Sequence, residues 1–148
     1  MIPITASTVV VVTNPISLNS AAATTAAIDT KGWRHCRIVV SFGVVGGAAT
    51  VFKVQESNDD GSTDAYAEVT GLVASGSTGD GRLPQTSDAN KVAIFDISLL
   101  GRDRYLDLNL TTGATTLVSA IAILTRGEAA PDTAAEKGAT AGYFAIPA

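Results

Sequence analysis

Two residues with catalytic side chains stand next to each other, His35 and Cys36, and they are the only histidine and the only cysteine in the chain. An imidazole beside a thiol is a common way to activate a nucleophile. The residues around them are β-branched, which predicts a strand, and neighbours in a strand point to opposite faces of a sheet. We therefore expect both residues to be structural. With no second histidine for a triad elsewhere, we predict no catalytic residues and no enzymatic activity.

Metal ligands are equally sparse. A zinc site needs four ligands from cysteine, histidine and carboxylates, and the chain has one of each of the first two. One turn is rich in oxygen-bearing side chains, but its spacing does not match a calcium-binding EF-hand loop. We expect a solvated hairpin turn there and no metal or cofactor, with a weak structural cation as the open alternative. The turn comprises Asn58, Asp60, Gly61 and Asp64, flanked by Glu56 and Glu68.

A glycine-rich run at residues 76–81 superficially resembles a phosphate-binding loop. Such a loop follows a strand, opens a helix and continues with a lysine and a serine or threonine. Here Arg82, Leu83 and Pro84 follow instead. The sequence therefore predicts that the run belongs to a long, mobile loop over residues 74–90.

Charge and hydropathy narrow the classes of function. The net charge is −4, only 16% of residues are charged, and the ten basic residues are scattered. Nucleic-acid binding requires a basic face, so we expect no direct contact with nucleic acid. No apolar run reaches the 18 or so residues of a membrane span, and the first residues do not resemble a signal peptide. We expect a soluble protein made in the cytoplasm, with no membrane partner.

The remaining sequence is dominated by short β-branched runs separated by turn residues, which predicts a single all-β domain, an antiparallel β-sandwich or jelly roll. Leu106, Leu108 and Leu110 should face inward, between outward-facing Asp107 and Asn109. A continuous apolar run around residues 38–40 suggests a strand buried on both faces. The strands are expected at residues 2–18, 33–45, 50–57, 66–73, 91–99, 105–110 and 115–125, with residues 21–28 leaning towards another.

We divide the chain into an N-terminal strand or arm (1–20), a sandwich core (21–126) and a C-terminal arm (127–148). Apolar side chains in the two arms are candidates for contacts between subunits or with a larger assembly. For the C-terminal arm, the alternative is that it folds back on its own domain or is disordered. The candidate contact residues are Val9, Val11, Tyr143, Phe144 and Ile146.

Several strand-and-turn motifs together resemble the small head decoration, or cement, proteins of tailed bacteriophages. The resemblance covers about residues 25–130, and it carries no catalytic residues. The motifs are residues 28–33 (IDTKGW), 37–43 (RIVVSFG), 52–62 (FKVQESNDDGS), 93–97 (AIFDI), 101–107 (GRDRYLD) and 120–126 (AIAILTR).

This resemblance implies a structural virion protein on the outside of the capsid, which binds the major capsid protein and stabilises the expanded head. Three-fold or quasi-three-fold sites on a capsid favour small cyclic oligomers, so we expect a trimer first and a dimer second. Arg102 and Arg104 should brace the adjacent turn through Asp103 or Asp96, with a capsid contact as the alternative. A different class of function remains open, a tail or fibre module that binds host glycans. That function predicts clustered aromatic residues, whereas Trp33, Tyr66 and Tyr105 are separated in the sequence.

Overall fold

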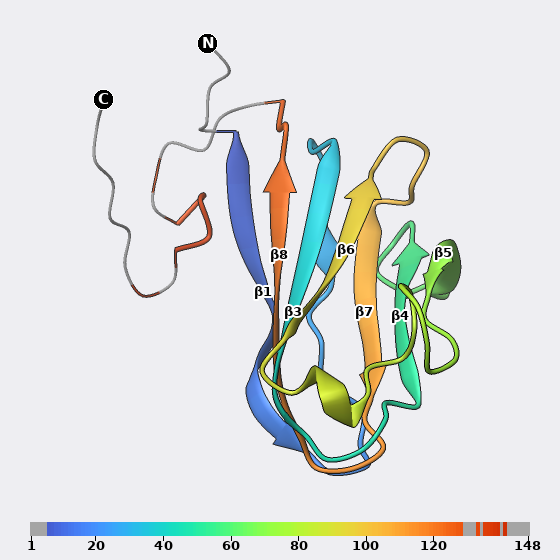
Figure 1. Ribbon diagram of the computed structural model, residues 1–148. Helices are drawn as coiled ribbons and strands as arrows, with labels where there is room; N and C mark the ends of the chain where they lie inside the picture. Colours follow the sequence, from blue (N-terminus) through green and yellow to red (C-terminus); the bar gives the residue numbers. More distant parts are fainter. Residues whose placement is uncertain (1–5, 129–132, 134, 140, 142–148) are drawn as a thin grey trace.

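The chain forms two antiparallel four-stranded sheets that pack face to face (Figure 1). The computed structural model describes residues 6–128, 133, 135–139 and 141. The predicted all-β sandwich is confirmed, and the described residues hold one helical turn, η1 (Thr86–Asp88). The strands are β1 (Ser7–Leu18), β2 (Ile28–Asp29), β3 (His35–Val45), β4 (Val51–Ser57), β5 (Ala67–Val73), β6 (Val92–Ser98), β7 (Tyr105–Thr111) and β8 (Thr116–Thr125).

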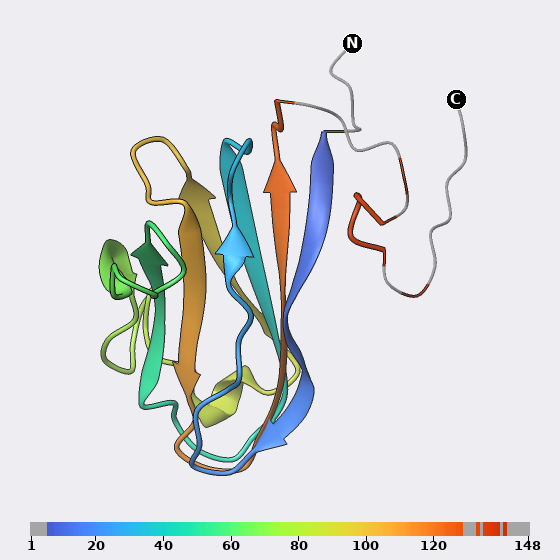
Figure 2. The same cartoon turned by 180° about the vertical axis from the view of Figure 1, so that it is seen from behind.

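The strand order is that of a jelly roll. Sheet A has the order β1-β8-β3-β6 and sheet B the order β2-β7-β4-β5. The first strand pairs with the last, the second with the seventh, the third with the sixth and the fourth with the fifth. This nesting is what results when one long antiparallel hairpin is rolled into two layers. In both views β1 and β5 lie at opposite sides of the molecule (Figures 1 and 2), while β6, the end strand of sheet A, is drawn between them.

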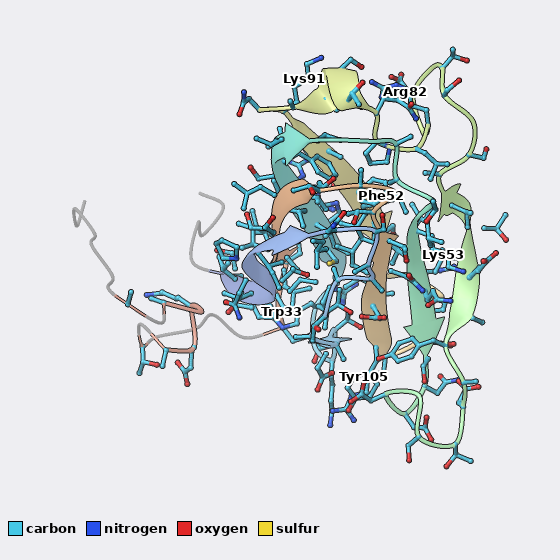
Figure 3. The ribbon with its side chains drawn as sticks, turned by 90° about the horizontal axis from the view of Figure 1, so that it is seen from below. Trp33, Phe52, Lys53, Arg82, Lys91 and Tyr105 are labelled. Atoms are coloured by element: carbon cyan, nitrogen blue, oxygen red, sulfur yellow. The ribbon has the colours of Figure 1, made fainter. Side chains whose placement is uncertain are left out.

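The core lies between the sheets and is mainly aliphatic. Leu106, Leu108 and Leu110 are buried, as their alternation with polar residues predicts. On β4, Phe52 is buried between the sheets while Lys53 lies on the outside (Figure 3). Period-two alternation on the strands thus sorts side chains into a shared interior and two outer faces.

One expectation about β3 is wrong. The strand was expected to be buried on both faces, but its exposure alternates along its length. Cys36, Ile38 and Val40 face the core, while Arg37 and Ser41 are exposed on the other side. In a sandwich of two layers, even a central strand has one face that no second sheet covers.

The segment before β2 is a crossover rather than the strand that its composition favoured. Among residues 21–27 the only ladder contact is an isolated bridge from Ala22 to Thr111. The Ala26 N–H donates to the Val12 carbonyl of sheet A, and the Ala23 N–H donates to the Leu110 carbonyl of sheet B. Backbone hydrogen bonds therefore hold the segment alternately to the two sheets as it passes from one to the other.

The edge strand β1 belongs to the sandwich and is irregular. Its register against β8 shifts twice, between Val11 and Thr13 and again before Ile16. Residues from the C-terminal part of the chain lie along its outer side. The Val9 N–H donates to the Lys137 carbonyl at 3.1 Å, and the Thr8 hydroxyl donates to the backbone carbonyl of Glu136.

Candidate interaction face

The outer face of sheet A carries an unbroken apolar row. The strand registers place Val11 beside Ile121, Ile121 beside Val39 and Val39 beside Ile94, so the row crosses all four strands. Exposure at the two ends and in the middle is 39% for Val11, 37% for Ile121 and 54% for Ile94. Residues opposite each other in an antiparallel pair share a face, so these side chains form one surface.

Further aliphatic side chains extend this row into a patch. Val9 and Ile123 lie opposite each other, one step along the strands from the row. Leu117 lies over Gly43, where an added Cβ would come within 2.8 Å of a Leu117 methyl group. Single exposed hydrophobic residues are ordinary, whereas a contiguous group usually marks a contact surface. Val92 is 60% exposed and lies two residues from Ile94 on β6, so it shares the same face. We define the aliphatic face as Val9, Val11, Val39, Val92, Ile94, Leu117, Ile121 and Ile123.

The outer face of sheet B is different in chemistry. Polar side chains on its strands are joined in pairs by a hydrogen bond or an ion pair, one of them with Thr25 from the segment before β2. Burial raises the pKa of Asp107, an effect partly offset by the hydrogen bond that it accepts from Thr25. The outer face of sheet B is therefore polar, with its side chains linked to one another across the strands. The pairs are Lys53 with Glu68, Asn109 with Gln55, and Thr25 with Asp107.

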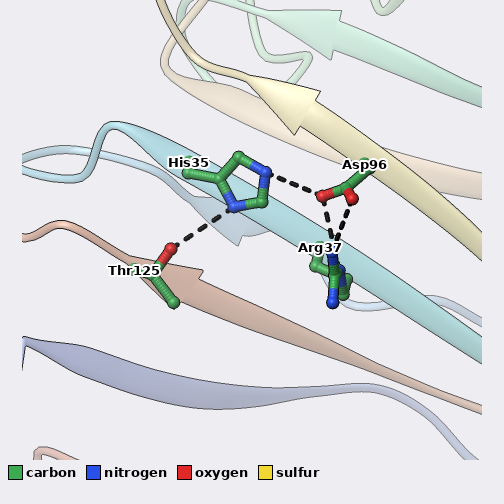
Figure 4. A network of polar contacts seen from close by, with 4 residues as sticks. All are labelled: His35, Arg37, Asp96 and Thr125. Atoms are coloured by element: carbon green, nitrogen blue, oxygen red, sulfur yellow. Dashed lines mark hydrogen bonds and ion pairs between the residues drawn. The ribbon is translucent and has the colours of Figure 1, made fainter. Parts of the chain in front are cut away.

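A polar cluster borders the aliphatic face at one end of sheet A (Figure 4). Asp96 on β6 accepts hydrogen bonds from the Arg37 guanidinium, whose Nη2 lies 2.6 Å from Oδ2. The Nε2 atom of His35 lies 2.7 Å from Asp96 Oδ1, and its Nδ1 atom lies 3.3 Å from the Thr125 hydroxyl. The hydrogen bond from Arg37 lowers the pKa of Asp96, so this carboxylate stays ionised.

The carboxylate, imidazole and hydroxyl of Asp96, His35 and Thr125 follow one another in the order found in a hydrolytic triad. A triad also needs donors for the developing oxyanion, usually backbone N–H groups. His35 and Thr125 are on β3 and β8, two inner strands of sheet A that pair with neighbours on both sides. Their backbone donors are engaged in the sheet, and Arg37 shares the carboxylate with the imidazole. The arrangement thus serves better as a polar clamp across three strands.

The neighbouring Cys36 points the other way, as strand geometry predicts. It is fully buried in the core, and burial raises the pKa of its thiol to about 12. A thiol with that pKa is a poor nucleophile near neutral pH.

The predicted contact residues fall into two groups. The first group, Val9 and Val11 from the predicted N-terminal arm, lies on the aliphatic face, where the two residues pair with Ile123 and Ile121 of β8. Tyr143, Phe144 and Ile146 lie outside the described residues.

The acidic turn between β4 and β5 uses its carboxylates internally. Asp59 accepts the backbone N–H groups of Thr63 and Asp64, and Asp64 accepts that of Asn58. Its neighbour Asp60 accepts the Tyr66 hydroxyl at 2.6 Å. In the described part of the chain, no three residues from histidine, cysteine, aspartate and glutamate come together as metal ligands. These bonds fit the solvated hairpin turn that the sequence favoured.

The two arginines after β6 do brace the approach to β7, but with partners other than those expected. Arg102 pairs with Glu56 at 3.1 Å and Arg104 pairs with Asp29 at 2.6 Å. The expected partner Asp96 is taken by Arg37 and His35. Sequence proximity suggested Asp103, whereas the sheet brings β2 and β4 to these arginines from far away in the chain.

Sequence reasoning missed the aliphatic face because the face exists only in the strand register. Val39, Ile94 and Ile121 come from three separate segments, and each one alone reads as part of a buried strand. One signal was available, since the runs around Val39 and Ile121 are apolar at both odd and even positions. In an alternating sheet, such runs imply an apolar outer face wherever no second layer covers it.

No protein-family model matches this chain, and neither does any of the curated proteins searched. Among the described residues, no helix has the length and apolar character needed to cross a membrane.

Proposed function

We propose that this chain is a structural virion protein that binds the outer surface of a phage capsid and stabilises the expanded head. The aliphatic face of sheet A is the docking surface. The observation that carries the proposal is the unbroken row from Val11 through Ile121 and Val39 to Ile94, which crosses all four strands with Val11, Ile121 and Ile94 exposed and Val39 half-buried. The jelly roll is also a common architecture of viral capsid proteins, which adds support at the level of fold.

A flat aliphatic sheet face fits a binding partner that is itself large and flat. Affinity in such an interface comes from the apolar area at its centre, with polar groups at the rim. Here the rim is supplied by the cluster of His35, Arg37 and Asp96, which can hydrogen-bond to a partner without leaving a charge unpaired.

The protein would act as a clamp. A ligand that binds one state of a two-state system stabilises that state by its binding free energy. If the complementary surface forms only when the shell expands, each bound copy favours the expanded shell over its precursor.

Cosedimentation tests this proposal directly. The full chain is mixed with expanded heads of the phage that encodes it and, separately, with unexpanded procapsids. We expect saturable binding to expanded heads and little binding to procapsids. Failure to bind either particle would contradict the proposal.

A pair of matched variants locates the surface. Ile121→Lys places a charge in the middle of the aliphatic row, and Thr70→Lys places the same charge on exposed β5 in sheet B. We expect Ile121→Lys to weaken head binding by at least about tenfold, the equivalent of about 1.4 kcal/mol. Thr70→Lys should bind as the parent does. Equal binding by both variants would move the docking surface away from sheet A.

The alternative function is a tail or fibre module that binds host glycans through aromatic side chains. The ring of Tyr66 is half-buried and lies against Gly61, with its hydroxyl bonded to Asp60, while Arg104 lies 4.8 Å over the ring of Tyr105. Neither ring therefore presents a free platform to a sugar. Binding to a glycan array without binding to heads would favour the tail-module alternative.

A further inference from the structure

The two sheets have four edge strands, and three of them are protected against pairing with another chain. Strand β1 has two register shifts and is lined by residues 136–137, and β2 is two residues long. In β5 the register against β4 shifts, and Gly71 adopts a positive φ of 87°. Bulges, short strands and covering segments are the usual means by which proteins block sheet edges.

Strand β6 is the exception. It pairs with β3 in an uninterrupted register over all seven of its residues, Val92–Ser98. At its two ends, the Phe42 N–H donates to the Lys91 carbonyl and the Leu99 N–H donates to the Arg34 carbonyl.

Because antiparallel pairing alternates, the odd-numbered residues between these two bonds direct their backbone groups toward β3. The even-numbered residues direct theirs away, to the open side of the sheet. None of the described residues is hydrogen-bonded to these outward backbone groups. They belong to Val92, Ile94, Asp96 and Ser98.

A groove runs along this open edge. One part, of about 430 Å³, is lined by β6 from Val92 to Asp96 and continues into a second part, of about 380 Å³, lined by β6 from Asp96 to Ser98. Strand β5 contributes Leu72 to both parts. Phe95 also lines the groove and stays half-buried, although its ring packs 4.9 Å from that of Phe52. An added strand at β6 would complete the cover over these apolar side chains.

The shape and charge of the groove narrow down its occupant. Its far wall is β5 together with residues 79–82, so it admits one extended segment rather than the edge of a whole sheet. All the charged side chains along it except Asp80 have partners within the chain, since Asp96 pairs with Arg37, Arg82 with Asp88, Arg102 with Glu56 and Glu68 with Lys53. An uncharged segment with alternating apolar residues is the complement of such a groove.

The chain itself contains a segment of that kind. Residues 138–148 carry no charged side chain, and Phe144 and Ile146 have the two-residue spacing of one strand face. Gly138 is seated on Val9 of β1, at the opposite edge of sheet A from β6. From there the segment would have to cross the whole outer face to reach its own groove, whereas the groove of an adjacent copy can meet it directly.

We propose that the groove along β6 receives residues 142–148 of a neighbouring copy as an added strand, so that copies join head to tail. A contact of this type closes into a ring when the rotation between copies allows it. This inference concerns contacts between copies and does not depend on the proposed capsid role.

Native mass spectrometry of the full chain, without capsid, tests the proposal. We expect the parent protein as an oligomer, with a mass that is a whole multiple of 15.0 kDa. Ile94→Pro removes an outward N–H that no described residue accepts, so it should reduce the mass to that of one copy. The control Ile94→Val keeps both the N–H and the apolar character, and should remain oligomeric. If Ile94→Pro strongly lowers the melting temperature, Ser98→Pro, at the end of β6, serves as a second variant with an impaired groove.

A complementation experiment identifies the donor. The double variant Phe144→Ser, Ile146→Ser has an intact groove but an impaired donor segment, and should be monomeric alone. Mixed with Ile94→Pro, which has an impaired groove and an intact donor segment, it should give 1:1 heterodimers. This rescue requires donation between copies.

Three results would overturn the proposal. A monomeric parent protein means that the groove takes its own tail or none. A donor variant that still oligomerises points to pairing between two β6 edges. Mixed variants that stay monomeric exclude exchange of the strand. Since capsid binding is measured separately, loss of either proposal leaves the other testable.

Discussion

The two sheets of this jelly roll are alike on the inside and opposite on the outside. Their inner faces are mainly apolar, with Leu108 of sheet B and Leu124 of sheet A both almost fully buried. Outside, sheet B pairs its polar groups across strands, as Lys53 does with Glu68. Sheet A instead exposes an aliphatic row through Ile121. Folding requires only the inner pattern, so the difference between the outer faces reflects a second demand on sheet A.

The proposed docking of sheet A on a partner would account for that second demand. An exposed aliphatic row contributes little to the stability of the isolated domain, because its side chains remain partly in water. It contributes substantially once a partner removes that water. The same side of the molecule also carries the open edge of β6, whereas the free edge of β5 is bulged. Both unsatisfied features thus belong to sheet A.

The largest effects on the free energy of unfolding are expected from substitutions on the inner faces, where the two sheets should contribute equally. Leu108→Ala and Leu124→Ala each remove a buried side chain from one inner face, so each should lower the free energy of unfolding by about 2–5 kcal/mol. Guanidinium denaturation of the two variants measures both losses. A loss at one site much smaller than at the other would show that one sheet dominates the core, and would break the symmetry assumed here.

On the outer faces, matched substitutions should change the surface hydrophobicity of the protein in sheet A only, and should have little effect on its stability in either sheet. Ile121→Thr and Asn109→Thr each place threonine on the outer face of a central strand, and each should change the free energy of unfolding by about 1 kcal/mol or less. Only Ile121→Thr should elute earlier from a hydrophobic-interaction column. Equal retention of both variants would mean that the aliphatic row is not the adhesive surface of the molecule.

The sequence was sufficient for the architecture because local patterns specify it. Leu106, Leu108 and Leu110 alternate with polar residues, and that alternation alone orients β7. Turn residues between the apolar runs set the number of strands, and together they predicted the sandwich. The error on β3 has the same origin, since an apolar run does not reveal whether one or two layers cover it.

The interaction face could not be predicted in the same way, because it depends on contacts between distant segments. Arg37 and Asp96 are 59 residues apart, and only the register of β3 against β6 brings them together. Proximity in the sequence instead suggested Asp96 as a partner for Arg102 or Arg104. Pairing between strands is set by packing of the whole sheet, which a pattern read along one segment does not contain.

The smallest expected effects concern one carboxylate on each outer face, and they have opposite signs. In sheet A, the hydrogen bond from Arg37 lowers the pKa of Asp96 below 3.8. In sheet B, burial raises the pKa of Asp107 above that same value. Asp96 thus adds stability above about pH 4, which is lost as the pH falls through its lowered pKa. Asp107 does the reverse, since its protonated form is favoured in the fold and ionisation at higher pH costs stability.

Replacing each carboxylate by its amide isolates these contributions. Asp96→Asn should reduce the loss of stability that occurs as the pH falls below about 4. Asp107→Asn should make the protein slightly more stable near neutral pH, since an amide oxygen can still accept the Thr25 hydroxyl. Thermal melts from pH 2.5 to pH 7 measure both effects, and carboxyl-carbon NMR titration of the parent protein reads the two pKa values directly. If the two titrations moved in the same direction, the contrast between a charge-paired cluster on sheet A and a partly desolvated carboxylate on sheet B would be wrong. Opposite movements would show that the outer faces differ in electrostatics as well as in hydrophobicity.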